Sequence, residues 1–244
     1  MRRGPKAMWE WFVVGLVSSL LDQTLALGFG LTSSLILVSA LGADPREVVP
    51  TILAAQALTS VPAYLIIRKL KVPSQLFLFL LVTSVMTVIL PFGLKALKTK
   101  DALALYSLSL FLTVAIMVAM DKGFLKPDLK ATLLLSLLVS LDKVMVGGGL
   151  SLALVILQKS MGVSLSEALM SLPVIKALPV LTSLIGYCGS SLCPRPAPSF
   201  AMAAGAALGS YASKKLHSKI RIRDEYSVLL LLIGAAVSAL RALY

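Results

Sequence analysis

Apolar runs of helical length alternate along the chain with short polar connections. Glycine, proline or clustered Lys and Arg bound most of the runs, and such residues begin or end helices. A helix needs about 20 apolar residues to cross the hydrocarbon core of a bilayer, and most of the runs approach that length. The pattern predicts ten helical segments, at about 8–27, 30–41, 45–67, 73–97, 102–120, 131–147, 150–161, 166–185, 198–213 and 226–243.

Two of these segments, 30–41 and 150–161, are too short to span a bilayer comfortably. Each follows a glycine break, Gly28-Phe29-Gly30 in the first case and Gly147-Gly148-Gly149 in the second. We therefore expect each to form a broken pair with the segment before it. Prolines within the longer segments are expected to bend them, at Pro62 and Pro91, with Pro173 and Pro179 both falling within 166–185.

The same pattern occurs twice, at an offset of 120 residues and without a gap. Apolar residues match easily by chance in such a chain, but Asp, Gly and Glu matching in one register indicate a duplication. Gln56 and Lys176 occupy equivalent positions within apolar runs. The identical positions are Leu21/Leu141, Asp22/Asp142, Gly28/Gly148, Ile36/Ile156, Leu37/Leu157, Gly42/Gly162, Glu47/Glu167, Ala57/Ala177 and Leu58/Leu178.

We therefore expect an all-α membrane protein of two pseudo-symmetric repeats, each a broken helical pair plus three helices. Residues 1–121 form the first repeat, 122–130 the linker and 131–244 the second repeat, in a single membrane-embedded domain. If each broken pair dips in and returns, three crossings remain per half and the repeats are inverted, a recurrent design in transporters. If each pair makes one interrupted crossing, the halves are parallel. Basic loops on both faces leave the orientation open.

Composition supports placement in the cell membrane as a multi-pass protein. The chain is 58% hydrophobic and 14% charged, with a mean hydropathy of +0.92, whereas soluble domains carry about a quarter charged residues. Arg2, Arg3 and Lys6 before an apolar run imitate a signal peptide. The apolar stretch 8–41 is far longer than the about 7–15 residues of a signal-peptide core, so we expect it to be retained.

The net charge of +12 does not indicate nucleic-acid binding, because Lys and Arg gather at the ends of apolar runs, where they anchor to lipid headgroups. His217 is the only histidine, so there is no histidine-based triad or zinc cluster, and no P-loop is present. We expect no enzyme, cofactor or metal. Cys188 and Cys193 define neither a disulfide scaffold nor a metal cage, which leaves a thiol role open.

The glycine breaks predict an anion site. Non-helical backbone at membrane depth is costly unless it is buried in protein or lines a wet cavity. The first N–H groups of 30–41 and 150–161 lack helical partners and, with the helix dipole, attract an anion. Close helix packing at glycine is the alternative interpretation. The predicted substrate-binding residues are Gly28, Gly30, Thr32, Ser33, Gln56, Gly148, Gly149, Ser151 and Lys176.

Lys176 is the best single candidate for neutralising a bound anion, with Gln56 as its uncharged counterpart. A lysine within an apolar helix costs several kcal/mol unless it is partnered, solvated or snorkels to a boundary. Asp22 and Asp142 each lie six residues before a break, and with Lys143 they are candidate coupling groups. An Asp142–Lys176 or Asp22–Lys143 pair stays open, as does a structural role for both aspartates as caps of the broken helices.

At these residues the chain resembles the TauE/SafE family of sulfite and organosulfonate exporters. The resemblance lies in Asp22 and Asp142, in the glycine breaks that follow them, and in Gly42 and Gly162 after the short helices. The stretch 203–211 with Lys214 and Lys215 is similar to the penultimate helix of that family. Where the family often has Gly-Thr-Asn-Lys, this chain has Pro50-Thr51-Ile52-Leu53, a departure that bears on the particular substrate.

The resemblance implies transport of a small sulfur-containing anion, such as sulfite, an organosulfonate or thiosulfate, across the cytoplasmic membrane. It implies no cofactor, and the expected partners are the small anionic substrate and membrane lipid. The alternatives are a carrier of another small solute or of a cation, a membrane-embedded thiol-dependent enzyme, and a membrane scaffold without transport.

Overall fold

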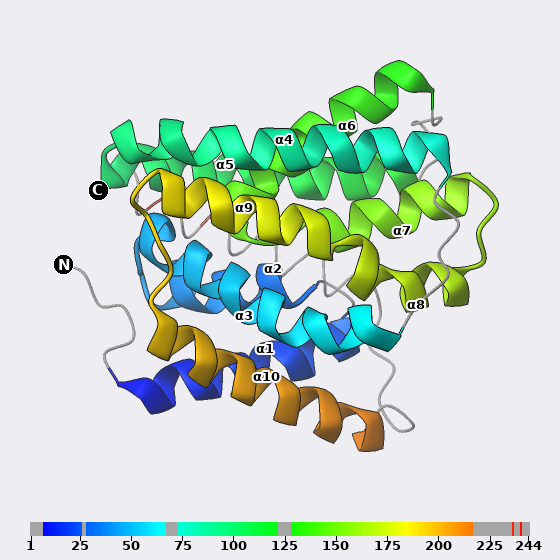
Figure 1. The fold of residues 1–244 in the computed structure, drawn as a ribbon. Coiled ribbons are helices and arrows are strands. Elements are labelled where there is room, and N and C mark those ends of the chain that lie inside the picture. The colour runs from blue at the N-terminus through cyan, green and yellow to red at the C-terminus, as the bar shows by residue number, and fades with distance from the viewer. Residues whose placement is uncertain are drawn as a thin grey trace.

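The computed structural model describes residues 7–25, 28–66, 73–121, 128–216, 236 and 240. Every regular element in these ranges is a helix, as the hydrophobic pattern predicts, and the helices pack into one bundle (Figure 1). In chain order they are α1 (Met8–Leu25), α2 (Phe29–Ser34), the π-helix η1 (Leu35–Ala40), α3 (Pro45–Ile66), α4 (Ser74–Ala96), α5 (Thr99–Asp121), α6 (Leu129–Val146), α7 (Leu150–Ser160), α8 (Leu165–Ile175), α9 (Ala177–Gly189) and α10 (Pro196–Leu216).

Most predicted boundaries lie within a few residues of the observed ones. The short segment predicted at 30–41 is α2 continued directly by η1, and α3 and α4 each run as one element through Pro62 and Pro91. The predicted tenth segment, 226–243, lies outside the described residues except for positions 236 and 240, and residues 122–127 of the linker also lie outside them.

The prediction of a single helix over 166–185 is wrong, because the chain forms two helices, α8 and α9, that meet at Lys176. Pro179 is the third residue of α9. Its ring has no N–H to donate to the carbonyl of Ile175 and crowds that carbonyl, which disfavours a regular helix at this point. Proline is accepted in the first turn of α9 because N–H groups there have no helical partner. Lys176 therefore lies at a junction.

The described elements correspond between the two halves in the register that the sequence predicts. Adding 120 to the bounds of α1 gives α6, and the same offset relates α2 with η1 to α7, α3 to α8 with α9, and α4 to α10, within three residues. Packing follows the same correspondence. Helix α1 packs along α10, as α6 packs along α4, and α3 packs against α10, as α9 packs against α4. The halves are interlocked, since each first helix packs on a helix of the other half.

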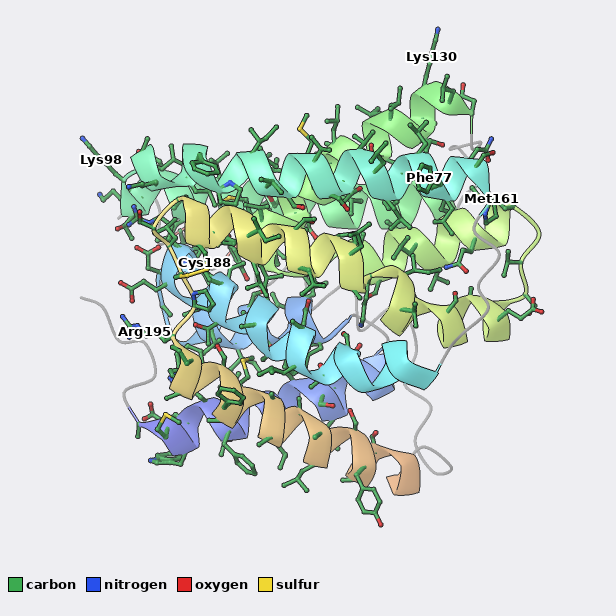
Figure 2. All side chains as sticks on the ribbon, in the orientation of Figure 1. Phe77, Lys98, Lys130, Met161, Cys188 and Arg195 are labelled. Atoms are coloured by element: carbon green, nitrogen blue, oxygen red, sulfur yellow. A yellow bond between two sulfur atoms is a disulfide. The ribbon has the colours of Figure 1, made fainter. Side chains whose placement is uncertain are left out.

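The equivalent helices α4 and α10 begin at opposite ends of the bundle. Figure 2 places Phe77 and Met161 near one end and Lys98, Cys188 and Arg195 near the other. Helix α4 begins on the Phe77 side and ends before Lys98, whereas α10 begins directly after Arg195.

Glycines allow α1 and α10 to approach to backbone contact. A Cβ on Gly205 would lie 2.0 Å from the Phe12 carbonyl oxygen, and a Cβ on Gly15 would lie 2.1 Å from the Met202 carbonyl oxygen. Both distances are far below van der Waals contact, so neither position accepts a side chain. Gly205 and Gly209, four residues apart on α10, both lie at this contact, and small residues at such spacing let helix backbones approach closely.

Apolar side chains face outward over much of the surface, while hydroxyls face inward. Helix α4 exposes Phe77, Leu81, Val85, Ile89 and Phe92 and buries Thr83, Ser84 and Thr87. This is the reverse of a helix at the surface of a water-soluble protein. Within the described chain, α4 is also the one helix whose length and apolar composition suit a membrane span. Further exposed apolar side chains include Val13, Val17, Leu108, Phe111, Leu133, Leu134, Leu137, Leu178, Leu181, Ile185, Phe200 and Leu208.

The α1–α10 contact predicts that Gly205→Val forces the two helices apart. Overpacking of this kind costs about 1–3 kcal/mol, so we expect a lower melting temperature in thermal unfolding of the purified protein. Gly93→Ala is the matched control, because no heavy atom lies within 4 Å of a Cβ at Gly93 in α4. Alanine should leave stability unchanged or raise it by up to about 1 kcal/mol. Equal melting temperatures for the two variants would contradict the close packing.

A polar cluster fixes the start of α3 to the connection between α4 and α5. The Arg46 guanidinium donates from Nη2 to Asp44 Oδ2 at 2.6 Å and from Nε to Asp44 Oδ1 at 3.1 Å. It also donates to the Leu97 carbonyl oxygen and to Thr99 Oγ1, and Thr99 donates to Asp44 Oδ2. Burial acts to raise the pKa of Asp44, but the hydrogen bonds and the charge of Arg46, with Thr99, outweigh it and hold that pKa below its usual value.

The lowered pKa of Asp44 predicts a pH-dependent stability. A carboxyl whose pKa is lower in the folded state stabilises the fold above its unfolded pKa of about 3.9, and the contribution is lost as pH falls through the folded value. Asp44→Asn should therefore lower the melting temperature at pH 7, and the difference from the unsubstituted protein should shrink below about pH 4. Asp101→Asn, at an exposed position in the first turn of α5, keeps an oxygen that accepts from the Lys98 N–H and should change little. A pH-independent difference for Asp44→Asn would rule out this electrostatic account.

Candidate functional site: the crossing of the two breaks

The two glycine breaks lie against each other at the centre of the fold. A Cβ on Gly30 would lie 1.8 Å from the Gly147 carbonyl oxygen, and a Cβ on Gly148 would lie 2.7 Å from the Leu31 nitrogen. A Cβ on Gly28 would lie 3.7 Å from Ser151 Oγ. The start of α2 thus contacts the end of α6, and Gly28 contacts the start of α7. The sequence left two interpretations of the glycines, an anion site and close helix packing. In this conformation the glycines pack closely.

Asp22 caps the first break. Gly28 has φ 92°, a conformation that favours glycine, and it precedes α2 as its N-cap. The Gly28 N–H donates to Asp22 Oδ1 at 2.7 Å, and the Phe29 N–H also donates to this carboxylate. The amides that the sequence assigns to a substrate anion therefore bind the protein's own carboxylate here. Capping is one of the roles that the sequence left open for the aspartates.

Asp142 reaches over the second break in a similar way. Gly147 ends α6 with φ 77°, and Gly149 has φ 69°, so both need the left-handed conformation that glycine adopts readily. A Cβ on Gly149 would lie 1.8 Å from Asp142 Oδ2, so only glycine leaves room for the carboxylate. Each break is thus flanked by the carboxylate from the helix that precedes it.

A buried polar ring joins the two halves at the crossing. Lys143 Nζ donates to Gln56 Oε1 at 2.6 Å and to the Gly147 carbonyl oxygen at 3.2 Å, and Gln56 Nε2 donates to the same carbonyl at 3.0 Å. The exposed fraction is 2% for Lys143 and 6% for Gln56. The last carbonyls of a helix lack intrahelical donors, and a cation there complements the helix dipole. Lys143 therefore caps its own helix while Gln56 adds a bond from the other half.

Two buried tyrosines also bind backbone or hydroxyl groups beside the breaks, and the sequence did not single them out. The Tyr187 hydroxyl of α9 donates to the Val144 carbonyl oxygen near the end of α6. The Tyr106 hydroxyl of α5 lies 3.3 Å from Ser34 Oγ and 3.4 Å from Ser39 Oγ, where α2 passes into η1. A tyrosine inside an apolar helix usually needs a partner for its hydroxyl, which is the signal that could have marked both.

Lys176 lies partly exposed at the junction of α8 and α9 rather than inside a continuous helix. Its charge acts on both Asp22 and Lys143, which places it close to the crossing. Asp142 acts on Lys143 in turn. Lys176 is thus an electrostatic neighbour of Asp22, and Asp142 is one of Lys143.

The predicted hydroxyl donors differ in their surroundings. Thr32 Oγ1 lies within donating distance of the carbonyl oxygens of Gly28, Phe29 and Ser18, so this hydroxyl is already bonded to backbone. Ser33 is fully buried, and its Oγ has no hydrogen-bond partner among the described residues. Ser151 is partly exposed and lies beside Gly28. Ser33 and Ser151 therefore remain the better candidates for contact with a ligand.

The two cysteines form a disulfide, Cys188–Cys193, across the connection between α9 and α10. The sequence left a thiol role open for these residues, because two cysteines alone define no disulfide framework. Neither is a free thiol in this structure. Among the described residues, no three His, Cys, Asp or Glu side chains group as ligands for a metal ion.

Compared with protein-family models, with curated proteins and with solved structures, the chain matches none of them.

The polar ring predicts coupled effects of substitution at Gln56 and Lys143. Gln56→Leu removes one acceptor from a buried ammonium and one donor from the Gly147 carbonyl, so it should lower stability by about 1–3 kcal/mol. Adding Lys143→Met should cost less than the sum of the two single variants, because the ammonium no longer needs the amide. Gln158→Leu, which removes a separate buried bond to Ser171, serves as the control and should add independently to Lys143→Met. Additive effects at Gln56 and Lys143 in denaturant unfolding would show that the two do not act as a pair.

Proposed function

We propose that the chain is a multi-pass membrane protein with inverted repeats, and that it carries small sulfur-containing anions by alternating access. The observation that carries this proposal is the crossing of the two helix breaks, with charged and amide groups buried around it inside a shell of exposed apolar side chains.

Membrane placement is supported by where polar and apolar side chains lie. A large exposed apolar surface is costly in water, and buried serines, threonines and a lysine are costly in a dry core unless they are bonded. A lipid environment explains the outward face of α4. Among its inward hydroxyls, Thr87 donates to the Ser84 carbonyl oxygen and pairs with the Thr182 hydroxyl. Interrupted helices inside a lipid-facing shell are typical of transporters.

The inverted arrangement is supported by the opposite directions of α4 and α10 (Figure 2). These helices are equivalent in the register of 120 residues. A rotation that places the first half on the second therefore reverses the direction of the helices along the bundle. Each half then presents its broken pair from its own side, and the breaks meet near the middle. In this arrangement, rocking one half against the other opens the crossing to the two sides in turn.

An anion as substrate is supported by the charges at the crossing. Lys176 is a partly exposed lysine there, and Lys143 is a buried lysine bonded to neutral oxygens. In the proposed cycle the anion pairs with Lys176 and competes with Asp22 for the N-terminal amides of α2. Asp22 and, at the second break, Asp142 are the proposed coupling groups, because a carboxylate displaced by substrate becomes free to bind a proton.

The resemblance of the breaks to the TauE/SafE family favours sulfite, organosulfonates and thiosulfate among small anions. Each of these anions carries several acceptor oxygens. The side chains of Ser33, Ser151 and Lys176 can donate hydrogen bonds to such oxygens. A thiol-dependent enzyme is not proposed, because both cysteines are joined in a disulfide.

Uptake of labelled sulfite, thiosulfate and a small organosulfonate into proteoliposomes tests the proposal. Lys176→Ala should raise the half-saturation concentration or lower the rate about 10- to 100-fold, the equivalent of one charge-assisted hydrogen bond of about 1.5–3 kcal/mol. Lys95→Ala is the matched control, because Lys95 is an exposed lysine whose bond to Ser191 is long, at 3.4 Å. Unaltered transport by Lys176→Ala would remove Lys176 from the site, and absence of saturable flux for every anion would reject the carrier itself.

A further inference from the structure

The disulfide Cys188–Cys193 lies at one end of the helical bundle. Cys188 is near the end of α9, and Cys193 lies in the connection that leads to α10. Figure 2 shows Cys188 at the same end as Lys98 and Arg195, with Phe77 and Met161 towards the opposite end. Both cysteine residues are exposed, so a reductant in the surrounding compartment would reach them.

Disulfides persist in oxidising compartments outside the cytosol, whereas cytosolic thiol systems keep cysteines reduced. The two ends of a bundle that spans a membrane face two different compartments. We infer that the end bearing the α9–α10 connection faces the oxidising, extracytoplasmic side and that the opposite end, where α3 leads to α4 and α7 to α8, faces the cytosol. This inference rests on the membrane placement in the proposed function and adds the orientation to it.

Charge alone does not select this orientation, because basic residues occur at both ends. Lys95, Lys98, Lys100 and Arg195 lie in or beside connections at the disulfide end. Lys130 lies at the other end (Figure 2), and the sequence between the described parts of α3 and α4 contains Arg68, Lys69 and Lys71. The excess of Lys and Arg that marks cytoplasmic loops is therefore weak here, and the disulfide is the feature that distinguishes the two sides.

The orientation has a consequence for the Asp44–Arg46 cluster. Arg46 donates to the Leu97 carbonyl oxygen and to Thr99, so the cluster lies at the Lys98 end of the bundle. It therefore faces the same compartment as the disulfide. The external pH, and not that of the cytosol, then sets the protonation of Asp44.

Labelling of intact cells with a membrane-impermeant maleimide tests the orientation. Cys188→Ser leaves Cys193 as a single free thiol at the proposed outer end. Lys130→Cys in a Cys188→Ser/Cys193→Ser background places a single thiol at the start of α6, and Figure 2 shows Lys130 at the other end. We expect Cys193 to be labelled in intact cells, and the thiol at position 130 to be labelled only after permeabilisation. Lys98→Cys in the cysteine-free background repeats the outer-end measurement if Cys188→Ser folds poorly.

The unsubstituted protein supplies a second readout. When it is denatured and treated with a maleimide that adds mass, it should gain mass only after prior reduction, because both cysteines are joined. The opposite labelling pattern, labelling of both ends in intact cells, or free thiols without reduction would overturn the inference. Protection of both thiols in intact cells would also overturn it, and if the chain then fractionates with soluble protein, the membrane placement fails with it. Loss of anion flux with the expected labelling would reject the carrier and leave the orientation standing.

Discussion

The contact between two interrupted helices is the constraint on which the rest of the structure depends. An interrupted helix leaves N–H and C=O groups without intrahelical partners, and such groups are costly in an apolar interior. At Gly30 and Gly148 the backbones of the two halves touch, with no space for a side chain. The freed groups are therefore held within reach of side chains from the flanking helices, which makes two interruptions tolerable in one fold.

Each freed end finds a partner of suitable charge. Asp22 accepts from the amides that begin α2, where the helix dipole is positive, and Lys143 donates to the carbonyl of Gly147, where the dipole of α6 is negative. Gln56 and Tyr187 add bonds from α3 and α9, so the end of α6 is fixed by two further helices. All of these bonds are local to the crossing, so a rearrangement there would release several of them together. That property suits the proposed carrier, in which a substrate anion would replace the carboxylate at one break.

The interlocked packing of the halves explains why the crossing is central. Helix α1 packs on α10 and α6 packs on α4, so neither half forms its full set of helix contacts alone. Glycines at the α1–α10 contact bring those helices to backbone distance, and residues 28–30 and 147–149 of the two breaks are buried. The outward apolar faces then leave a surface that lipid would cover, which links the arrangement of the interior to the proposed environment.

The sequence by itself determined the helical class, most helix boundaries and the register of 120 residues, because these follow from hydrophobic runs, turn residues and local repetition. It also marked Asp22, Asp142 and the glycine breaks as one unit. Only the tertiary structure decided that Gln56 bonds to Lys143 across the halves, that Tyr187 reaches Val144, and that Cys188 and Cys193 are joined. The split at Lys176 was partly readable from the sequence. Pro179 is visible there, but only the structure shows that one helix ends and another begins before it. Contacts between residues far apart in the chain depend on how helices pack. The sequence pattern indicates which face of a helix is apolar, but not which helix packs against that face.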